Sequence, residues 1–268
     1  MYTLLVDETN KNYESGHFFI VGGLVFQPEQ VDLVDESVRK HAATAGFKAG
    51  DSFKFSTSER PQYVTPQQHS IAKAAVISDL RSIGVRMIAT VIMHDIARNT
   101  GFDIQMNYSL NTVARAFHKL LSAESATGMM FIDRDNDRYS HLEELFQTGL
   151  KFPNGSSQDL SDRIRMFGMT SDNSSNLSSA ADIALGSFRY CVNAQSGKGK
   201  VDVARNIFSN LSRIFWYGVD EKGKLTVKGY GYHPQPQIES VRNPVFQQRY
   251  YDLSDSLTQF SIQPIETK

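Results

Sequence analysis

The segment Val85–Met93 is apolar at nearly every position. Successive side chains of a β-strand point to opposite faces of its sheet, so a strand over these residues has two apolar faces. Such strands are typical of the interior of a sheet that helices cover on both sides. The segment therefore predicts an α/β fold in which helices flank a sheet.

The order of the other elements indicates a mixed sheet. Apolar runs that end in turn residues predict strands over residues 2–6, 17–27, 129–132 and 164–169. Apolar residues at helical spacing predict helices over residues 28–42, 66–83, 108–124, 140–149, 176–192 and 201–217. Phe53–Ser56 is expected to be a short extended piece, and residues 218–268 carry no firm assignment. The pair Gly22 and Gly23 inside the second strand suggests a bulge or a close backbone approach.

Composition gives no sign of a membrane or of a disulfide framework. The single cysteine, Cys191, lies in an apolar helical pattern, where a buried thiol is expected rather than a nucleophile. One cysteine excludes an internal disulfide, and a cysteine-based zinc site is not expected. The first residues lack the features of a signal peptide, and no run reaches the roughly 18 apolar residues that span a membrane. We therefore expect a cytoplasmic protein with no membrane association.

Two aspartates directly follow predicted strands. Asp7 comes after the first strand, and Asp133 comes after residues 129–132. If these strands are parallel neighbours, both carboxylates lie at the carboxyl edge of the sheet, where ligands of open α/β sheets bind. Neighbouring carboxylates repel each other unless a cation lies between them. An oxygen-only site of this kind suits Mg²⁺, or Mn²⁺ in its place.

A third aspartate, Asp182, borders the apolar face of a predicted helix. Its neighbours Ala181, Ala184 and Gly186 are small enough to let the helix approach a sheet closely. A buried carboxylate is costly without a partner, and a cation shared with Asp7 and Asp133 would supply one. The alternative is that strand-end aspartates cap turns and that Asp182 lies at the helix boundary.

Two other motifs resemble known acidic sites. Residues 133–144 imitate a calcium-binding loop, but the sixth position, which requires glycine, is Arg138. The loop acids Asp135 and Asp137 are therefore expected to be solvated, although either would be close enough to assist a metal at Asp133. Asp7-Glu8-Thr9 lacks the second aspartate of a phosphoaspartate enzyme. Neither motif is preferred.

The C-terminal third is basic. Residues 197–249 contain nine Lys or Arg and four Asp or Glu, although the formal net charge of the chain is −1. Such an excess would follow a phosphate backbone, with Lys198 and Lys200 as candidate substrate-binding residues. A solvated basic surface is the alternative, and residues 197–200 are too short for a phosphate-binding loop.

Four segments resemble, in order, the domain-of-unknown-function 3800 family (DUF3800). They are the Asp7-Glu8-Thr9 opening with its glycine pair, the lysine segment 53–56, the strand and aspartate 130–133, and the Ala-Asp helix 180–184. The resemblance covers residues 1–195 and implies an RNase H-like fold with a metal-dependent nuclease site. Residues 196–268 are expected to be a helical and turn-rich extension packed on the same domain.

The chain departs from the family pattern at two places. Thr9-Asn10 replaces Ser-Gly, and Ser52 stands where the family often has glutamate. Asp51 is adjacent, but a shift of one residue in a strand would point it to the other face. Glu8 is a candidate for the remaining ligand, although it would leave the strand on the side opposite to Asp7 unless the turn has begun.

Two hypotheses follow. In the first, Asp7, Asp133, Asp182 and Glu8 hold one or two Mg²⁺ ions, an activated water attacks a phosphodiester of a nucleic acid, and Lys54 contacts the scissile phosphate. The resemblance implies a place in bacterial defence, as a homo-oligomer or with a partner protein. In the second, the chain is a non-catalytic RNase H-like module that binds nucleic acid or a partner protein.

Overall fold

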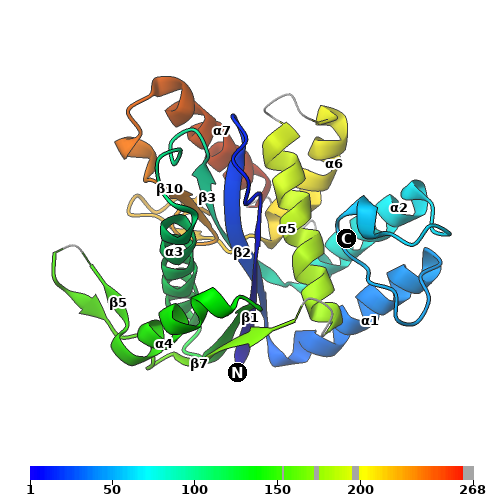
Figure 1. The fold of residues 1–268 in the computed structure, drawn as a ribbon, viewed down its shortest axis with the longest axis horizontal. Helices are drawn as coiled ribbons and strands as arrows, with labels where there is room; N and C mark the ends of the chain where they lie inside the picture. The colour runs from blue at the N-terminus through cyan, green and yellow to red at the C-terminus, as the bar shows by residue number, and fades with distance from the viewer. Residues whose placement is uncertain (153, 172–174, 195–198, 262–268) are drawn as a thin grey trace.

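A mixed sheet forms the centre of the protein (Figure 1). The computed structural model describes residues 1–152, 154–171, 175–194 and 199–261, with side chains to residue 258. Within these residues the sheet has six strands in the order β10-β3-β2-β1-β4-β7. The strands are β1 (Tyr2–Thr9), β2 (Phe18–Phe26), β3 (Arg86–Met93), β4 (Gly128–Asp133), β7 (Ile164–Thr170) and β10 (Tyr232–Gln235).

Strand direction places most carboxyl ends at one edge of the sheet. β2 is antiparallel to both β1 and β3. β4 is parallel to β1, β7 is parallel to β4, and β10 is parallel to β3. All of these strands except β2 therefore end at the same edge, where the loops that follow them gather.

Helices cover both faces of the sheet, which confirms the predicted α/β class with a mixed, helix-flanked sheet. The main helices are α1 (Pro28–Thr44), α2 (Pro66–Ile83), α3 (Phe102–Ala123), α4 (Tyr139–Thr148), α5 (Asn176–Ala194), α6 (Val201–Leu211) and α7 (Pro244–Ser261). Helix α5 packs on β1 and β2, and α1, α2 and α6 pack with it. Helices α3 and α4 lie on the other side of the sheet (Figure 1). None of the described helices is long and apolar enough to cross a membrane.

Strand β3 contributes to the apolar cores on both sides, as its sequence predicts. Met87 and Val91 belong to the core beneath α5, whereas Ile88 and Ile92 belong to the core beneath α3. Full burial of such a side chain stabilises the fold by about 1.5–3 kcal/mol. The strand therefore couples the two cores.

The glycine pair of β2 allows neighbouring strands to approach closely. A Cβ atom on Gly23 would lie 1.9 Å from the carbonyl oxygen of Leu5, and one on Gly22 would lie 2.6 Å from that of Ile88. The pairing registers of β2 with β1 and β3 are continuous through both glycines. The close approach was predicted correctly, and these registers contain no bulge.

Local capping explains where α2 begins and ends. Thr65 accepts a hydrogen bond from the backbone N–H of Gln68, and Pro66 occupies the first turn. Both are favoured at helix N-termini. Gly84 ends the helix in the left-handed conformation, with φ of 83°, which a residue without Cβ adopts at little cost.

Several boundaries differ from the sequence-based expectation. β1 continues through Asp7 to Thr9, so Asp7 lies within the strand and not after it. The segment Phe53–Ser56 is not a strand. Helix α3 begins six residues earlier than expected, and α6 ends at Leu211, where the short turn η3 (Ser212–Ile214) follows.

The C-terminal segment is more ordered than its sequence indicated. It contributes β10 to the sheet, and α7 packs against η3 and the turn η4 (Ile238–Ser240). The remaining short elements are β5 (Leu150–Lys151), β6 (Ser157–Gln158), β8 (Gly218–Val219), β9 (Leu225–Thr226), η1 (Thr57–Glu59) and η2 (Asn136–Arg138).

Candidate functional site

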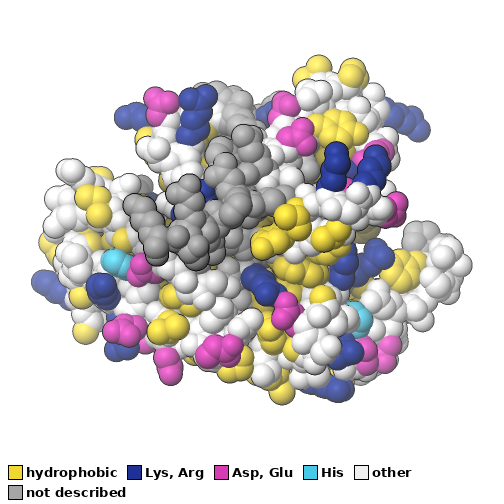
Figure 2. All heavy atoms as spheres, turned by 180° about the vertical axis from the view of Figure 1, so that it is seen from behind, with side chains coloured by type: hydrophobic (Ala, Val, Ile, Leu, Met, Phe, Trp, Pro, Cys, Tyr) yellow, Lys and Arg dark blue, Asp and Glu magenta, His cyan; other side chains and the backbone are white. Residues whose placement is uncertain are grey.

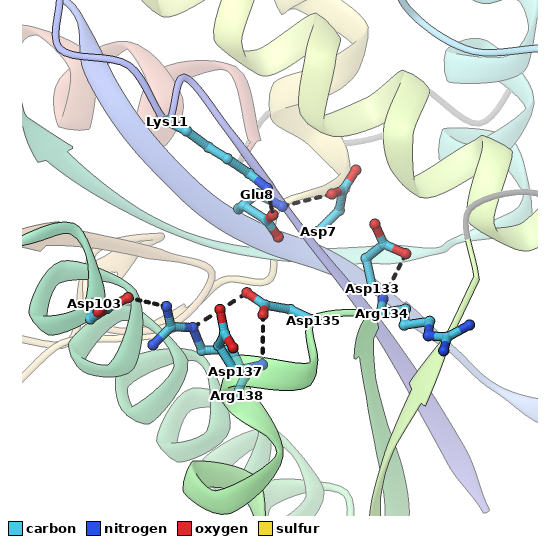
Figure 3. Close-up of polar contacts among 9 residues, drawn as sticks. All are labelled: Asp7, Glu8, Lys11, Asp103, Asp133, Arg134, Asp135, Asp137 and Arg138. Carbon is cyan, nitrogen blue, oxygen red and sulfur yellow. Dashed lines mark hydrogen bonds and ion pairs between the residues drawn. The ribbon is translucent and has the colours of Figure 1, made fainter.

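Asp7 and Asp133 lie side by side because their strands are parallel neighbours. The register pairs Val6 of β1 with Ile132 of β4, so the aspartate that follows each of them reaches the same level. Both carboxylates point into the space beside α5 (Figure 3). The condition under which both carboxylates share one edge, that the two strands are parallel neighbours, is therefore met.

Asp182 reaches the same place from α5. Its side chain lines a small cavity of about 20 Å³ together with those of Asp7 and Asp133. This volume is about that of one enclosed water molecule. The lining residues are Leu5, Val6, Asp7, Lys54, Asp133, Thr170, Ser171, Ser178, Ala181 and Asp182.

Small residues on α5 allow this arrangement. Ala181 is buried against the cavity, and Gly186 packs against the ring of Phe55, where an added Cβ would lie 2.3 Å from the Cγ atom. The Oδ2 atom of Asp182 accepts a hydrogen bond of 2.6 Å from the backbone N–H of Phe55. The loop that carries Lys54 is thereby attached to the helix that carries Asp182.

The acids around Asp7 oppose its ionisation. Burial, followed by the charges of Glu8 and Asp182, raises the pKa of Asp7 to about 7, against an opposing hydrogen bond from the backbone N–H of Glu8. Asp133 adds to the increase. A carboxyl group with a pKa near neutrality, facing further carboxylates, is stabilised in its charged form by a nearby cation.

The donor set matches a hard divalent cation. Asp7, Asp133 and Asp182 offer carboxylate oxygens only, which is the chemistry that Mg²⁺ prefers. Among the described residues, no group of three or more His, Cys, Asp or Glu side chains is arranged so that it could hold a metal ion. The three acids thus line one cavity and match the ion in donor chemistry, but their side chains are not arranged as metal ligands in this structure.

Lys54 lies at the cavity, as the sequence suggested, but on a loop and not on a strand. Its Nζ atom is 3.8 Å from the Oε2 atom of Glu59. Its carbonyl oxygen lies 2.7 Å from the Nε2 atom of His69. Contacts of both the backbone and the side chain therefore hold Lys54 at the wall of the cavity.

Glu8 does not join the cavity. Because β1 continues through Thr9, Glu8 and Asp7 leave the strand on opposite faces. Glu8 forms an ion pair with Lys11 (Figure 3). It acts on Asp7 through its charge and is not among the residues that line the cavity.

The place where the family often has glutamate also lies outside the cavity. Ser52 and Asp51 line a larger neighbouring cavity of about 660 Å³ between α1 and the start of α5. Asp51 accepts hydrogen bonds from the backbone N–H of Lys48 and from the hydroxyl of Tyr63. Neither Ser52 nor Asp51 lines the cavity of Asp7.

The loop after β4 is organised by an arginine. Arg138 is buried and forms ion pairs with Asp103 and Asp135 (Figure 3). Asp135 also accepts a hydrogen bond from the backbone N–H of Asp137. These contacts give Asp135 a structural role in the loop, in place of the solvated acid expected there.

The basic C-terminal segment is separate from the cavity. Lys198 lies outside the described residues. Lys200 is exposed at the start of α6, and its backbone N–H donates to the hydroxyl of Tyr190. On the face shown in Figure 2, Lys and Arg are interspersed with Asp and Glu. Lys200 is therefore not brought to the acids.

Several polar residues at the site were not predicted. Thr170 ends β7 and Ser171 follows it at the same edge, and Ser178 lies one turn before Asp182. The signal for the first two was available, because they directly follow a predicted strand. Lys73 lies close enough to both Asp182 and Arg189 for their charges to act on its pKa. The positions of Lys73 and Arg189 depend on how α2 and α5 pack, which local sequence does not show.

No protein-family model matches the chain, and no curated protein matches it. What the site can do is therefore argued from its own chemistry: a small acidic cavity at the carboxyl edge of a mixed sheet, with a lysine in its wall.

Proposed function

We propose that the protein is a Mg²⁺-dependent nuclease with an RNase H-like fold of the DUF3800 type. The observation that carries this proposal is the convergence of Asp7, Asp133 and Asp182 on one cavity. The sheet supports it, because β3, β2 and β1 form an antiparallel set that the parallel strands β4 and β7 extend. The raised pKa of Asp7 also supports it, since the site favours a positive charge.

Each acid has a role that its position supports. Asp7, Asp133 and Asp182 line the same cavity, so their carboxylates would together hold the Mg²⁺ or Mn²⁺. When bound, the cation supplies the charge that activates water and offsets the negative charge of a phosphodiester. Lys54, in the cavity wall, would bind an oxygen of the scissile phosphate.

Loss of an acid should abolish cleavage without unfolding the protein. We expect Asp133→Asn to lower Mg²⁺-dependent cleavage of RNA, DNA or hybrid substrates by at least about 100-fold, because the charge that holds the ion is lost. Asp202→Asn is a matched control, since the Asp202 side chain is 95% exposed on α6. Equal cleavage by wild type and Asp133→Asn would contradict the proposal.

A second candidate is a non-catalytic module that binds nucleic acid or a partner protein. It is favoured because no group of acids, histidines or cysteines in the described part of the chain is arranged to hold a metal ion, and because Ser52 and Asp51 lie outside the cavity. The two candidates differ in a measurement that needs no substrate. Thermal stabilisation of the wild type by Mg²⁺ or Mn²⁺, lost in Asp7→Asn, would favour the nuclease.

The setting of this activity is also a proposal. A single cysteine, buried on α5, suits a reducing compartment, so we propose that the protein acts in the cytoplasm. Burial raises the pKa of the Cys191 thiol, which keeps it protonated. The family resemblance suggests a role in bacterial defence, as a homo-oligomer or with a partner protein.

A further inference from the structure

Two cations lie against the ring of Phe55. The Nζ atom of Lys73 is 4.2 Å from the ring centroid, and the guanidinium carbon of Arg189 is 5.6 Å from it. Lys73 also donates to the carbonyl oxygen of Phe55 over 2.8 Å, and Arg189 donates to Thr9 Oγ1 over 3.1 Å. Lys73 on α2 and Arg189 on α5 are therefore both held against Phe55, and Arg189 also contacts β1.

The pair of Lys73 and Arg189 is connected to the acidic cavity through Phe55 and through β1. The backbone N–H of Phe55 donates to Asp182, and Thr9 lies two residues beyond Asp7 on β1. Arg189 comes seven residues after Asp182 on α5, which is about 10 Å along the helix toward the carboxyl edge of the sheet. Phosphates of one strand in a duplex are spaced by about 3.4 Å along its axis, so this length corresponds to roughly three nucleotides.

The environment of the pair favours an anion. Lys73 and Arg189 are both only partly exposed, and the charge of Arg189 contributes to lowering the pKa of Lys73. Burial lowers the pKa of Lys73 to about 8, although Asp182 opposes this change. Partly desolvated cations bind phosphate oxygens more strongly than solvated ones, and the planar guanidinium of arginine offers two parallel donors.

We propose that Lys73 and Arg189 bind a backbone phosphate of the nucleic-acid strand whose scissile phosphate lies at Asp7, Asp133 and Asp182. The inference rests on the proposed nuclease function and defines its substrate as a strand that extends beyond the cleaved bond toward Arg189. Phe55 holds the two cations at a fixed distance from the acids.

The test is direct binding of fluorescent single-stranded DNA and RNA oligonucleotides, with Ca²⁺ in place of Mg²⁺. We expect Lys73→Gln and Arg189→Gln each to weaken binding by about 5- to 10-fold and to lower the slope of log affinity against log salt by about one. Arg189→Lys keeps the charge and should keep the slope. Lys151→Gln is the control, because Lys151 is exposed and paired with Glu144 on the far side of the sheet (Figure 1).

The outcomes separate this inference from the proposed function. Thermal unfolding of each variant identifies loss of structure, and a folded Arg189→Lys then reports the role of the charge. Wild-type affinity and salt slope in both glutamine variants would overturn the inference, even if the wild type cleaves. Absence of oligonucleotide binding by the wild type would also overturn it. Binding that depends on both cations, without any cleavage, would support the inference and contradict the nuclease.

Discussion

The carboxylate of Asp182 accepts a hydrogen bond of 2.6 Å from the backbone N–H of Phe55, a residue 127 positions earlier in the chain. The contact joins α5 to the loop between α1 and α2, and it places Lys54 in the wall of the same cavity. A carboxylate that accepts a backbone N–H is held in orientation, so the loop and the acid are positioned together.

Replacement of Gly186 by alanine should disturb this junction. A Cβ atom there would lie 2.3 Å from Phe55 Cγ, so the ring and its loop must move away from α5. We expect Gly186→Ala to lower the free energy of unfolding by about 1–3 kcal/mol, measured by urea denaturation. Gly101→Ala is the comparison, since a Cβ there has no atom within 4 Å. A Gly186→Ala variant as stable as the wild type would show that the loop shifts without cost.

Asp7 should make stability depend on pH when no divalent cation is present. Its pKa rises from 3.8 in the unfolded chain to about 7 in the folded one, so the folded state binds the proton more tightly. Stability is therefore lost as the pH rises from about 4 to about 7, by up to ~4 kcal/mol. In EDTA, Asp7→Asn should be more stable than the wild type at pH 8, and the difference should vanish toward pH 4.

The free energies of unfolding of wild type and Asp7→Asn are measured by urea denaturation, and adding Mg²⁺ to the same samples provides the control. Mg²⁺ should restore stability to the wild type at pH 8 and leave Asp7→Asn unchanged, because a ligand that binds only the folded state stabilises it. A difference between the two proteins that stays constant from pH 4 to pH 8 would contradict the assigned pKa.

His233 should produce a pH dependence of the opposite sign. Burial, with further contributions from Lys119 and Arg115, lowers the pKa of its imidazole from 6.5 to about 4, although a hydrogen bond with the carbonyl of Tyr230 opposes this. The folded state then binds protons less tightly, so stability is lost as the pH falls from about 6.5 through 4, by ~3 kcal/mol at most. His233→Gln retains a donor for Tyr230 and should remove this loss, measured as the difference between the unfolding free energies of variant and wild type. If the difference in unfolding free energy between His233→Gln and wild type stays constant from about pH 6.5 to pH 4, His233 does not cause the loss of stability.

The main elements of the fold could be predicted because their signals are local. The two apolar faces of β3 and the capping residues around α2 are visible in short stretches of sequence. The shared edge of Asp7 and Asp133 could be predicted only on the condition that their strands are parallel neighbours, which local sequence does not show.

Other features could not be predicted, for different reasons. Strand β10 contains Pro234, and a proline in a short segment argues against a strand there. The structure accommodates this proline because β10 lies at the edge of the sheet. The sequence of helix α7 does contain a helix signal, in the capping side chain of Asn243 and in the helical spacing of Tyr250, Leu253 and Leu257. The helix was not predicted because the residues around it are typical of turns. The contact of Arg189 with Thr9 arises only when α5 packs on β1.

The long separation between the acids has a consequence for biosynthesis. A ribosome releases the N-terminus first, so Asp7 leaves the exit tunnel well before Asp133, and Asp182 follows last. Because β1 and α5 must pack together before the cavity exists, the growing chain carries an incomplete set of acids through most of its translation. A nuclease assembled in this order would be inert beside the messenger RNA that encodes it until α5 has emerged.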